Sequence, residues 1–286
     1  MSLVQEQYIT HNTITDQEFA LFQALIYKEA GIYLSQTKKA LLVGRLAKRL
    51  QELSLKSFLA YYRYVAEQEE ELINLLDRIC TNETHFFREP HQFDFIRQHI
   101  FPDWSAKASK GLMQKRIRVW SAACSTGEEP YSIAMQLLDH FPPSVGWEIS
   151  IIATDLSTRV LAKAQEAMWP INKAQEIPNH YLKRFMLKGT RTQEGKMKAS
   201  PEIRSIVEFQ RMNLNDDIYS VIGPFDLIFC RNVLIYFNLE SKTRVIKQLL
   251  NNLSSTGYLF LGHSESLQGL TRNVQCVAPT VYVKTH

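Results

Sequence analysis

A short turn carries two adjacent acidic residues directly after a stretch with the composition of a buried strand. That stretch is Ile117–Ala122, IRVWSA, and the small residues Ser125–Gly127 follow it. Glu128 and Glu129 come next, where the N-terminus of a helix favours negative charge. A strand, a turn and a helix in this order begin a nucleotide-binding α/β fold, whose ligand binds beyond the carboxyl end of the strand.

One glycine and two carboxylates restrict the ligand that this turn can bind. A pyrophosphate site needs glycines at GxGxxG spacing and a helix N-terminus without acids. The turn here would repel phosphate, and it suits a cofactor with a ribose and a positive charge, such as S-adenosylmethionine. The alternative is an ordinary βα turn whose acids only complement the helix dipole.

Two other segments carry polar residues suited to the same ligand. Trp147–Leu156 is predicted to be a strand with Asp155 at its end, about 25–30 residues after the turn, where an acid binds ribose hydroxyls. In Thr81–Ile100, the side chains of Asn82, Thr84 and Arg88 are spaced to converge on a ligand from an extended or turn segment. The alternative for this second segment is an irregular linker followed by the start of a helix.

The composition is that of an ordinary soluble globular protein, with 45% hydrophobic and 22% charged residues among 286. This length allows one large domain or two modest ones. No run approaches the ~20 apolar residues that span a bilayer, and the polar N-terminus lacks a signal-peptide core. We therefore expect a cytoplasmic protein without membrane insertion.

The charge and the candidate metal ligands exclude further classes. A net charge of +4 without a strong local cluster does not predict nucleic-acid binding. Four cysteines are scattered without metal-ligand spacing and are expected to be reduced and half-buried. His85 and His91 have no partner ligands at suitable spacing, so no metal site is expected.

The first eighty residues predict a small helical domain. Residues 1–14 are expected to be a flexible leader, and 15–80 the helical domain. Its predicted helices are Phe19–Gly31, Lys38–Leu53, Ser57–Glu67 and Glu69–Cys80.

One helix of this domain combines an apolar stripe with a basic face. The stripe consists of Leu41, Leu42, Leu46, Leu50 and Leu53, and the basic face of Lys38, Lys39, Arg45, Lys48 and Arg49, with no acid before Glu52. A basic face of this kind is either a solvated surface or a docking site for an acidic partner.

The remaining chain predicts an α/β domain. Residues 81–115 are expected to be a linker with a cofactor-contacting segment and a charged connector, and 116–286 the α/β domain. A small antiparallel β-subdomain is expected as an insertion at about 171–212. Further predicted strands are Ile206–Leu214, Pro224–Phe237, Gly257–Glu265 and Thr280–Lys284. The order predicts a mostly parallel sheet with an antiparallel edge strand.

Several long motifs in this order resemble the CheR-type chemotaxis receptor methyltransferases. They are TNETHFFRE, WSAACSTGEEPYSIA, ATDLS, MNL, FDLIFCRNVLIYF and GHSES, and the helical stretch GIYLSQTKKALLVGRLAKRL is similar to the family's N-terminal domain. The resemblance extends over residues 15–285. It implies a Rossmann-like class I methyltransferase sheet with an N-terminal helical domain and a small inserted β-subdomain.

The resemblance also implies an activity and a set of site residues. The activity is S-adenosylmethionine-dependent methylation of glutamate carboxylates on the cytoplasmic domains of chemoreceptors, with S-adenosylhomocysteine as product and no metal. In some members the β-subdomain binds a receptor's C-terminal peptide, and the sequence does not decide whether this one does. The residues that match the family's cofactor contacts are Asn82, Thr84, Arg88, Glu129, Asp155, Asn213, Leu214, Cys230 and Arg231, with Glu128 as the alternative to Glu129. Arg88 and Tyr236 match residues close to the transferred methyl group and are the expected catalytic residues.

The chemistry of a carboxylate acceptor fits these motifs. A glutamate side chain is ionised at pH 7, since its reference pKa is about 4.3, so its attack on a methyl group needs no general base. Catalysis then depends on in-line positioning and the removal of water. Two alternatives are a receptor-docking adapter without turnover and a methyltransferase for RNA or a small molecule. Cys230–Tyr236 lacks the Asp/Asn-Pro-Pro-Tyr/Phe loop of enzymes that methylate nucleobase amines, which disfavours the latter.

Overall fold

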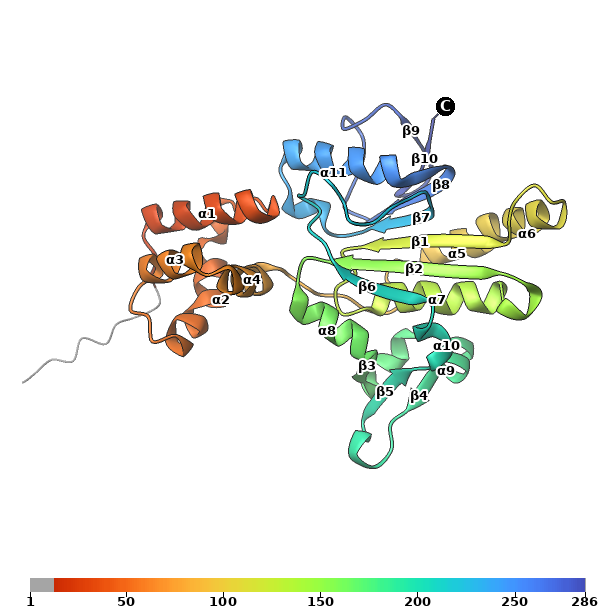
Figure 1. The fold of residues 1–286 in the computed structure, drawn as a ribbon, viewed down its shortest axis with the longest axis horizontal. Coiled ribbons are helices and arrows are strands. Elements are labelled where there is room, and N and C mark those ends of the chain that lie inside the picture. The colour runs from red at the N-terminus through yellow and green to blue at the C-terminus, as the bar shows by residue number, and fades with distance from the viewer. Residues whose placement is uncertain (1–12, 286) are drawn as a thin grey trace, which may run out of the picture. The chain divides into compact units, whose positions relative to one another are not determined.

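The chain forms two compact units, Met1–Thr81 and Asn82–His286 (Figure 1). The structure is a computed structural model, and it describes residues 13–285. The first unit is helical, with α1 (Asp16–Ala30), the 3₁₀ turn η1 (Gln36–Lys38), α2 (Lys39–Glu52), α3 (Phe58–Glu67) and α4 (Glu69–Ile79). Among the described residues, no helix is both long enough and apolar enough to cross a bilayer.

The ends of α1 follow its local sequence. Thr15 and Glu18 form a capping box at the N-terminus, and Gly31 ends the helix in the left-handed conformation with φ 68°. Residues 1–12 of the expected leader lie outside the described residues. Ile14 does not belong to a loose leader, because it is 6% exposed and packs in the core of this unit.

The apolar stripe of α2 is narrower than predicted. Leu42, Leu46 and Leu50 are fully buried, whereas Leu53 is half-buried and Leu41 is exposed. Three leucines at four-residue spacing already cover the buried side of the helix, and Leu41 lies 100° from Leu42 on the helical wheel.

The second unit contains a seven-stranded sheet in the order β6-β2-β1-β7-β8-β10-β9. Its strands are β1 (Arg116–Ala122), β2 (Glu148–Asp155), β6 (Val207–Arg211), β7 (Phe225–Cys230), β8 (Leu253–Leu261), β9 (Val274–Ala278) and β10 (Val281–Lys284). The first five are parallel to one another. The chain runs from β1 to one edge and then returns to the other side of β1, so the strand order reverses between β1 and β7. Ligands bind at such a reversal.

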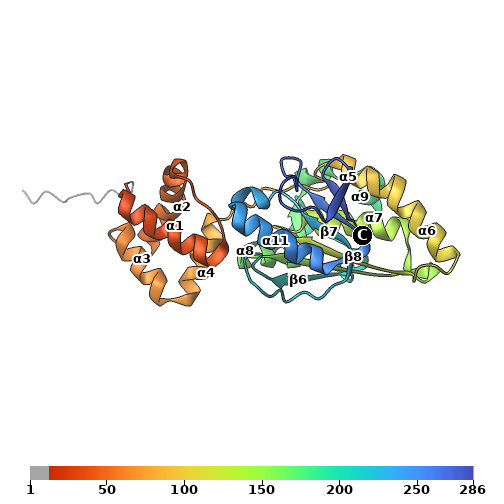
Figure 2. The ribbon, with the colours of Figure 1, turned by 90° about the horizontal axis from the view of Figure 1, so that it is seen from above.

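Alternate residues of each central strand pack on opposite faces of this sheet. Val119 and Phe229 belong to the core cluster that includes side chains of the helices before and after β1, whereas Trp120 and Ile228 belong to the cluster with α11. The helices of this unit are α5 (Pro90–Phe95), the π-helical turn η2 (Ile96–Ile100), α6 (Phe101–Ser109), α7 (Glu128–His140), α8 (Thr158–Glu166) and α11 (Leu239–Asn252), with short 3₁₀ turns η3 (Pro143–Val145) and η6 (Leu234–Tyr236) (Figure 2).

The inserted subdomain is a separate three-stranded antiparallel sheet in the order β3-β5-β4. It comprises β3 (Met168–Pro170), η4 (Ile171–Glu176), α9 (Asn179–Phe185), β4 (Met186–Lys188), η5 (Arg191–Gln193) and β5 (Lys196–Ala199), and the short helix α10 (Pro201–Arg204) follows. The strands thus end at Ala199, earlier than the predicted bound near 212, because Val207–Arg211 pairs with β2 in the main sheet.

Two further features of the α/β unit differ in detail from what the sequence predicts. The expected connector over 101–115 is largely helical, because Phe101 and Trp104 are buried and α6 continues η2 without a break. The antiparallel strand is β10, which lies between β8 and β9 and pairs with both, so it is not an edge strand. The edge strand is β9, which pairs antiparallel with β10 and was not among the predicted strands.

Candidate active site

The turn between β1 and α7 has the left-handed backbone that a close approach requires. Ala123, Ser125 and Gly127 have φ of 71°, 50° and 94°. A Cβ on Gly127 would lie 3.0 Å from the Cβ of Ala164, so a larger residue would push α8 away. The turn is therefore built around the single glycine of the predicted motif.

Asp155 connects this turn to the end of β2. One carboxylate oxygen accepts the N–H of Ser125 at 2.8 Å, and the other accepts the N–H of Ser157 at 2.9 Å. The backbone carbonyl of Asp155 accepts the N–H of Met212 at 3.0 Å, which places Asn213 and Leu214 directly beside the end of β2. The carboxylate is thus fixed in orientation where β1 and β2 end.

Residues 82–88 lie against the same turn and are held through their backbone. The Ser125 hydroxyl donates to the carbonyl of Asn82 at 3.0 Å, and the Lys173 ammonium donates to the carbonyl of Thr84 at 3.1 Å. The N–H of Phe86 donates to the Glu176 carboxylate at 2.9 Å. Within the described part of the chain, the side-chain amide of Asn82 and the hydroxyl of Thr84 have no hydrogen-bond partner, so both can bind a ligand.

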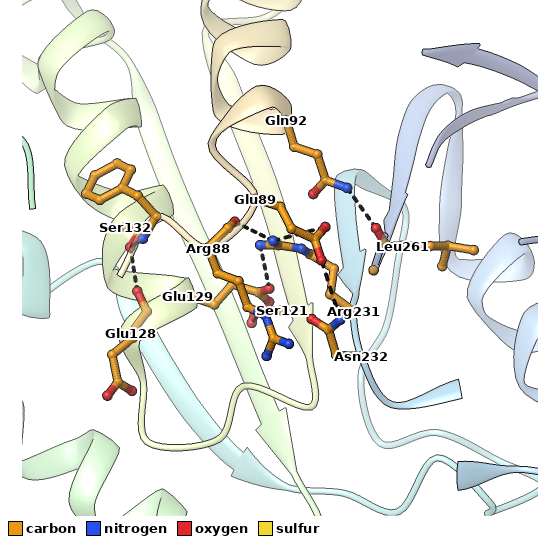
Figure 3. A network of polar contacts seen from close by, with 12 residues as sticks. Arg88, Glu89, Gln92, Ser121, Glu128, Glu129, Ser132, Arg231, Asn232 and Leu261 are labelled. Carbon is orange, nitrogen blue, oxygen red and sulfur yellow. Dashed lines mark hydrogen bonds and ion pairs between the residues drawn. The ribbon is translucent and has the colours of Figure 1, made fainter. Parts of the chain in front are cut away.

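A buried arginine connects the ends of β1 and β7 (Figure 3). Arg231 is 6% exposed. One of its terminal nitrogens lies 3.2 Å from Glu129, and the other lies 3.3 Å from Glu89 and donates to the carbonyl of Arg88. Glu129 also accepts a hydrogen bond from the Ser121 hydroxyl at 2.6 Å.

The two acids bound to Arg231 respond differently to burial. Burial raises the pKa of the Glu129 carboxyl, and the charge of Arg231 and the hydrogen bond from Ser121 offset this only in part. Burial acts in the same direction on Glu89, but the charge of Arg231 and hydrogen bonds from His263 and Asn232 hold its pKa below the usual range. A cationic ligand beside Glu129 would relieve the cost of keeping that carboxylate charged.

The geometry separates Glu129 from Glu128. Glu128 is 1% exposed, pairs with the Lys173 ammonium and accepts from the Thr126 hydroxyl at 2.6 Å. In Figure 3 its side chain points away from Arg231, whereas the side chain of Glu129 points toward it. Glu128 is therefore engaged with η4, and Glu129 is the acid available to a positively charged ligand.

Arg88 differs from Arg231 because no described acid pairs with its guanidinium. Its guanidinium donates to the backbone carbonyl of Glu83 at 3.1 Å, and it forms no ion pair with any described residue. Tyr236, in η6, is half-buried, and its hydroxyl likewise has no hydrogen-bond partner among residues 13–285. The segments beside the strand ends thus carry one arginine without an ion-pair partner, Arg88, and one tyrosine hydroxyl without a hydrogen-bond partner, that of Tyr236, among the described residues.

The donor set fits S-adenosylmethionine. Two carboxylates, Glu129 and Asp155, lie at the ends of neighbouring elements for an ammonium and for ribose hydroxyls, and the turn offers no glycine-rich cradle for phosphate. When bound, this cofactor supplies an electrophilic methyl group on sulfur.

Comparison with known proteins agrees with this assignment. A family model described as "CheR methyltransferase, SAM binding domain" matches residues 82–283, and one described as "CheR methyltransferase, all-alpha domain" matches residues 17–80. The chain belongs to the CheR family of methyltransferases. It is 33% identical to the chemotaxis protein methyltransferase of Borreliella burgdorferi over 99% of this chain and 100% of that protein. It is 36% identical to chemotaxis protein methyltransferase 2 of Pseudomonas aeruginosa (94% and 93%) and to the Escherichia coli chemotaxis protein methyltransferase (94% and 91%).

These comparisons confirm the predicted family and fold class, and they establish a SAM-dependent chemotaxis protein methyltransferase. In this CheR-family chain, two of the proposed cofactor contacts are available only through the backbone. Cys230 is 0% exposed and the side chain of Leu214 is also buried, both in the cluster with α11. Burial raises the pKa of the Cys230 thiol, so this cysteine is not a nucleophile at neutral pH.

Four residues that shape the site were not predicted from the sequence. Glu89 pairs with Arg231, and Ser121 donates a hydrogen bond to Glu129. Lys173 binds both the Glu128 carboxylate and the backbone carbonyl of Thr84. Glu265, in the GHSES motif, binds the loop after β7 through its carboxylate. The resemblance included this motif without assigning a role to any residue in it.

The basic face of α2 is less free than predicted. Arg49 pairs with Glu71 of α4 and Glu52, and Lys39 lies 2.7 Å from Asp16. The guanidinium of Arg45 donates to the carbonyl of Ile79 at the end of α4. The expectation of five exposed charges was wrong for these three, because helix packing brings acids and carbonyls from α1 and α4 to them. Lys38 and Lys48 are exposed and have no ion-pair partner among the described residues.

Among residues 13–285, no group of three or more His, Cys, Asp or Glu side chains is placed to hold a metal ion. The four cysteines are free thiols, two of them fully buried and Cys276 exposed.

We expect cofactor binding to weaken at acidic pH, because the charged form of Glu129 is the form that would attract a cationic cofactor. Since burial raises the pKa of this carboxyl, the loss is expected to begin above the ordinary titration range of glutamate, as pH falls. Isothermal titration of S-adenosylhomocysteine between pH 5 and 8 measures this. Glu129→Gln should bind about 10-fold more weakly at pH 8 and lose this pH dependence. A variant with the wild-type pH profile would contradict the role of Glu129.

Proposed function

We propose that this protein transfers the methyl group of S-adenosylmethionine to glutamate side chains on the cytoplasmic domains of chemoreceptors, giving glutamate 5-methyl esters in chemotactic adaptation. The observation that supports a carboxylate acceptor is the contrast between two arginines. Arg231 is neutralised by two acids, whereas Arg88 donates only to a neutral carbonyl. An anionic side chain of the substrate would complete the pairing of Arg88.

The roles of the residues follow from the chemistry of this transfer. The incoming carboxylate is already ionised at pH 7, so no protein group has to remove a proton. Arg88 holds the carboxylate, and the hydroxyl of Tyr236 orients it by a hydrogen bond. Glu129 and Asp155 hold the cofactor, with Asn82, Thr84 and the backbone of 213–214 and 230–231. Because opposite charges are brought together and cancel, orientation and removal of water contribute most of the rate enhancement.

The proposal is tested by transfer of labelled methyl groups to a chemoreceptor cytoplasmic fragment, followed by mild base. Release of the label as volatile methanol identifies a carboxyl ester and supports the proposal. Base-stable label would indicate N- or C-methylation and contradict the proposed acceptor. Binding of cofactor and receptor without transfer would favour a docking adapter, and transfer to RNA or a small molecule instead would favour the other alternative.

Tyr236→Phe should retain the fold and reduce kcat about 10-fold. The hydroxyl has no protein partner among the described residues, so its loss leaves no buried group unpaired. A substrate hydrogen bond worth about 1.4 kcal/mol corresponds to this tenfold change. Steady-state kinetics with a receptor fragment and a thermal melt measure both effects. An unchanged kcat would remove Tyr236 from the reacting groups.

We also propose that the exposed Lys38 of η1 and Lys48 of α2 contribute to docking of acidic receptor helices. Lys38→Glu with Lys48→Glu should lower kcat/KM for the receptor about 10-fold, mainly through the association rate, and leave kcat unchanged. The difference from wild type should shrink as salt is raised. Lys110→Glu with Lys247→Glu, at two exposed lysines of the second unit, is the control matched in charge. An equal loss in the control would contradict a local docking site.

In this proposal Lys39, Arg45 and Arg49 stabilise the docking helix and do not contact the receptor, since each is bound within its own unit.

For the β-subdomain, we propose that an edge strand of the β3-β5-β4 sheet binds a receptor's C-terminal peptide by strand addition. A titration in which no receptor tail peptide binds would contradict this.

A further inference from the structure

A buried carboxylate joins the end of β8 to the loop that follows β7. Glu265 is 6% exposed. One of its oxygens accepts the N–H of Gly262 at 2.7 Å and the N–H of Asn232 at 2.9 Å. The other accepts the N–H of Leu234 at 2.7 Å and that of Ile235 at 3.3 Å. One side chain thus binds backbone donors from two segments that are far apart in the sequence.

Two of these donors belong to the first turn of a helix. Leu234 and Ile235 begin η6 (Leu234–Tyr236), and the residue before it, Val233, provides no side-chain cap. The first N–H groups of any helix lack partners within the helix and attract negative charge. Glu265 therefore caps η6 from another part of the chain, and Tyr236 is the last residue of this short helix.

The close approach of the two segments depends on a glycine. A Cβ on Gly262 would lie 2.5 Å from the side-chain nitrogen of Asn232 and 2.7 Å from its backbone nitrogen. Asn232 itself has a left-handed backbone with φ 57°. The loop is therefore fixed in an unusual conformation by the Glu265 carboxylate on one side and by tight packing on the other.

We infer that Glu265 is a positioning residue for methyl transfer, which acts by holding the loop from Asn232 to Tyr236 in its reactive conformation. Arg231, at the beginning of this loop, is held by Glu89 and Glu129 and makes no hydrogen bond or ion pair with Glu265. Loss of the Glu265 contacts should therefore displace Tyr236 and leave the cofactor contacts in place. The expected effect on kcat rests on the proposed function, whereas the expected effect on the loop conformation rests on the hydrogen bonds alone.

The test compares Glu265→Gln with Asp226→Asn. The glutamine keeps the shape but presents an amide NH₂ to two backbone donors in place of an oxygen. Asp226 accepts the N–H of Arg118 at 2.8 Å at the opposite end of β7 through one oxygen, which an asparagine amide can replace, so Asp226→Asn controls for the loss of a carboxylate charge on β7 away from the site. Glu265→Asp, which keeps both oxygens on a shorter side chain, is a milder second variant in case the first folds poorly.

We expect kcat for a receptor fragment to fall about 10-fold in Glu265→Gln, as for loss of the Tyr236 hydroxyl itself, because Glu265 acts through the position of Tyr236. The Kd of S-adenosylhomocysteine should stay within about threefold of wild type, a split that a merely structural role would not produce. Amide hydrogen exchange over residues 231–237 should accelerate in Glu265→Gln and not in Asp226→Asn.

Two results would overturn the inference. The first is a kcat in Glu265→Gln within about threefold of that in Asp226→Asn, and the second is a loss confined to cofactor affinity. If the wild-type protein forms no base-labile ester, the proposed function fails. The exchange experiment then still tests whether Glu265 holds the loop, because it needs no substrate.

Discussion

Arg88→Ala is expected to lower kcat for receptor methylation about 1000-fold. This corresponds to about 4 kcal/mol, within the range for truncating one partner of a hydrogen-bonded charge pair that is removed from water. The fold should not change, because the guanidinium makes its only hydrogen bond within the described residues to the carbonyl of Glu83. Single-turnover methyl transfer at saturating cofactor measures the effect.

Two controls separate the role of Arg88 from charge and from cofactor affinity. Arg97→Ala removes an exposed arginine of η2 whose ion pair with Asp94 at 2.8 Å is local, and it should leave kcat unchanged. Arg88→Lys keeps the charge without the planar fork and should give an intermediate rate. A loss of S-adenosylhomocysteine affinity in Arg88→Ala larger than the loss of kcat would reassign Arg88 from the acceptor carboxylate to the cofactor.

The parts of the fold that local sequence determines were predicted well. The helix that closes at Gly31, the buried strand before Gly127 and the acid at the end of β2 all depend on neighbours within a few residues. The helical segment over 101–109 was missed because its polar residues outnumber Phe101 and Trp104, which bury it against the sheet. Only the tertiary contact reveals its helical face.

The residues of the candidate site also fall into those set by local sequence and those set by tertiary contacts. The acids Glu128, Glu129 and Asp155 could be proposed from the sequence because their chemistry and their place after a strand are local properties, whereas the choice of Glu129 over Glu128 came from the resemblance. The role of Arg231 could not be derived from its own neighbourhood, because its partners are Glu89, which is 142 positions earlier, and Glu129, which is 102 positions earlier. For Arg49 the prediction of a free charge was wrong. A helical projection places this arginine on the exposed face, but in the structure it forms an ion pair with Glu71 of another helix.

Arg231 also carries the largest expected effect on stability. Arg231→Ala leaves the carboxylates of Glu129 and Glu89 buried near each other without their shared cation. Removal of one partner from a buried ion pair costs about 3–5 kcal/mol, which for a domain of this size lowers Tm by roughly 10 °C. Denaturant unfolding and thermal melts measure this loss.

Arg184→Ala is the matched control, because Arg184 also lies between two acids, Asp139 at 2.8 Å and Glu202 at 3.4 Å, but its side chain is 38% exposed. Solvent-exposed pairs contribute only about 0–1 kcal/mol. Equal destabilisation by the two substitutions would contradict a buried network.

The dependence on pH tests the cause of the loss. Without Arg231, repulsion and burial both raise the pKa of Glu129 and Glu89, so the destabilisation of Arg231→Ala should decrease as the pH falls and these carboxyls become protonated. Glu89→Gln added to Arg231→Ala removes one of the two charges and should restore about half of the lost stability at pH 8. A double variant as unstable as the single variant would show that packing of the arginine side chain, and not its charge, stabilises this end of the sheet.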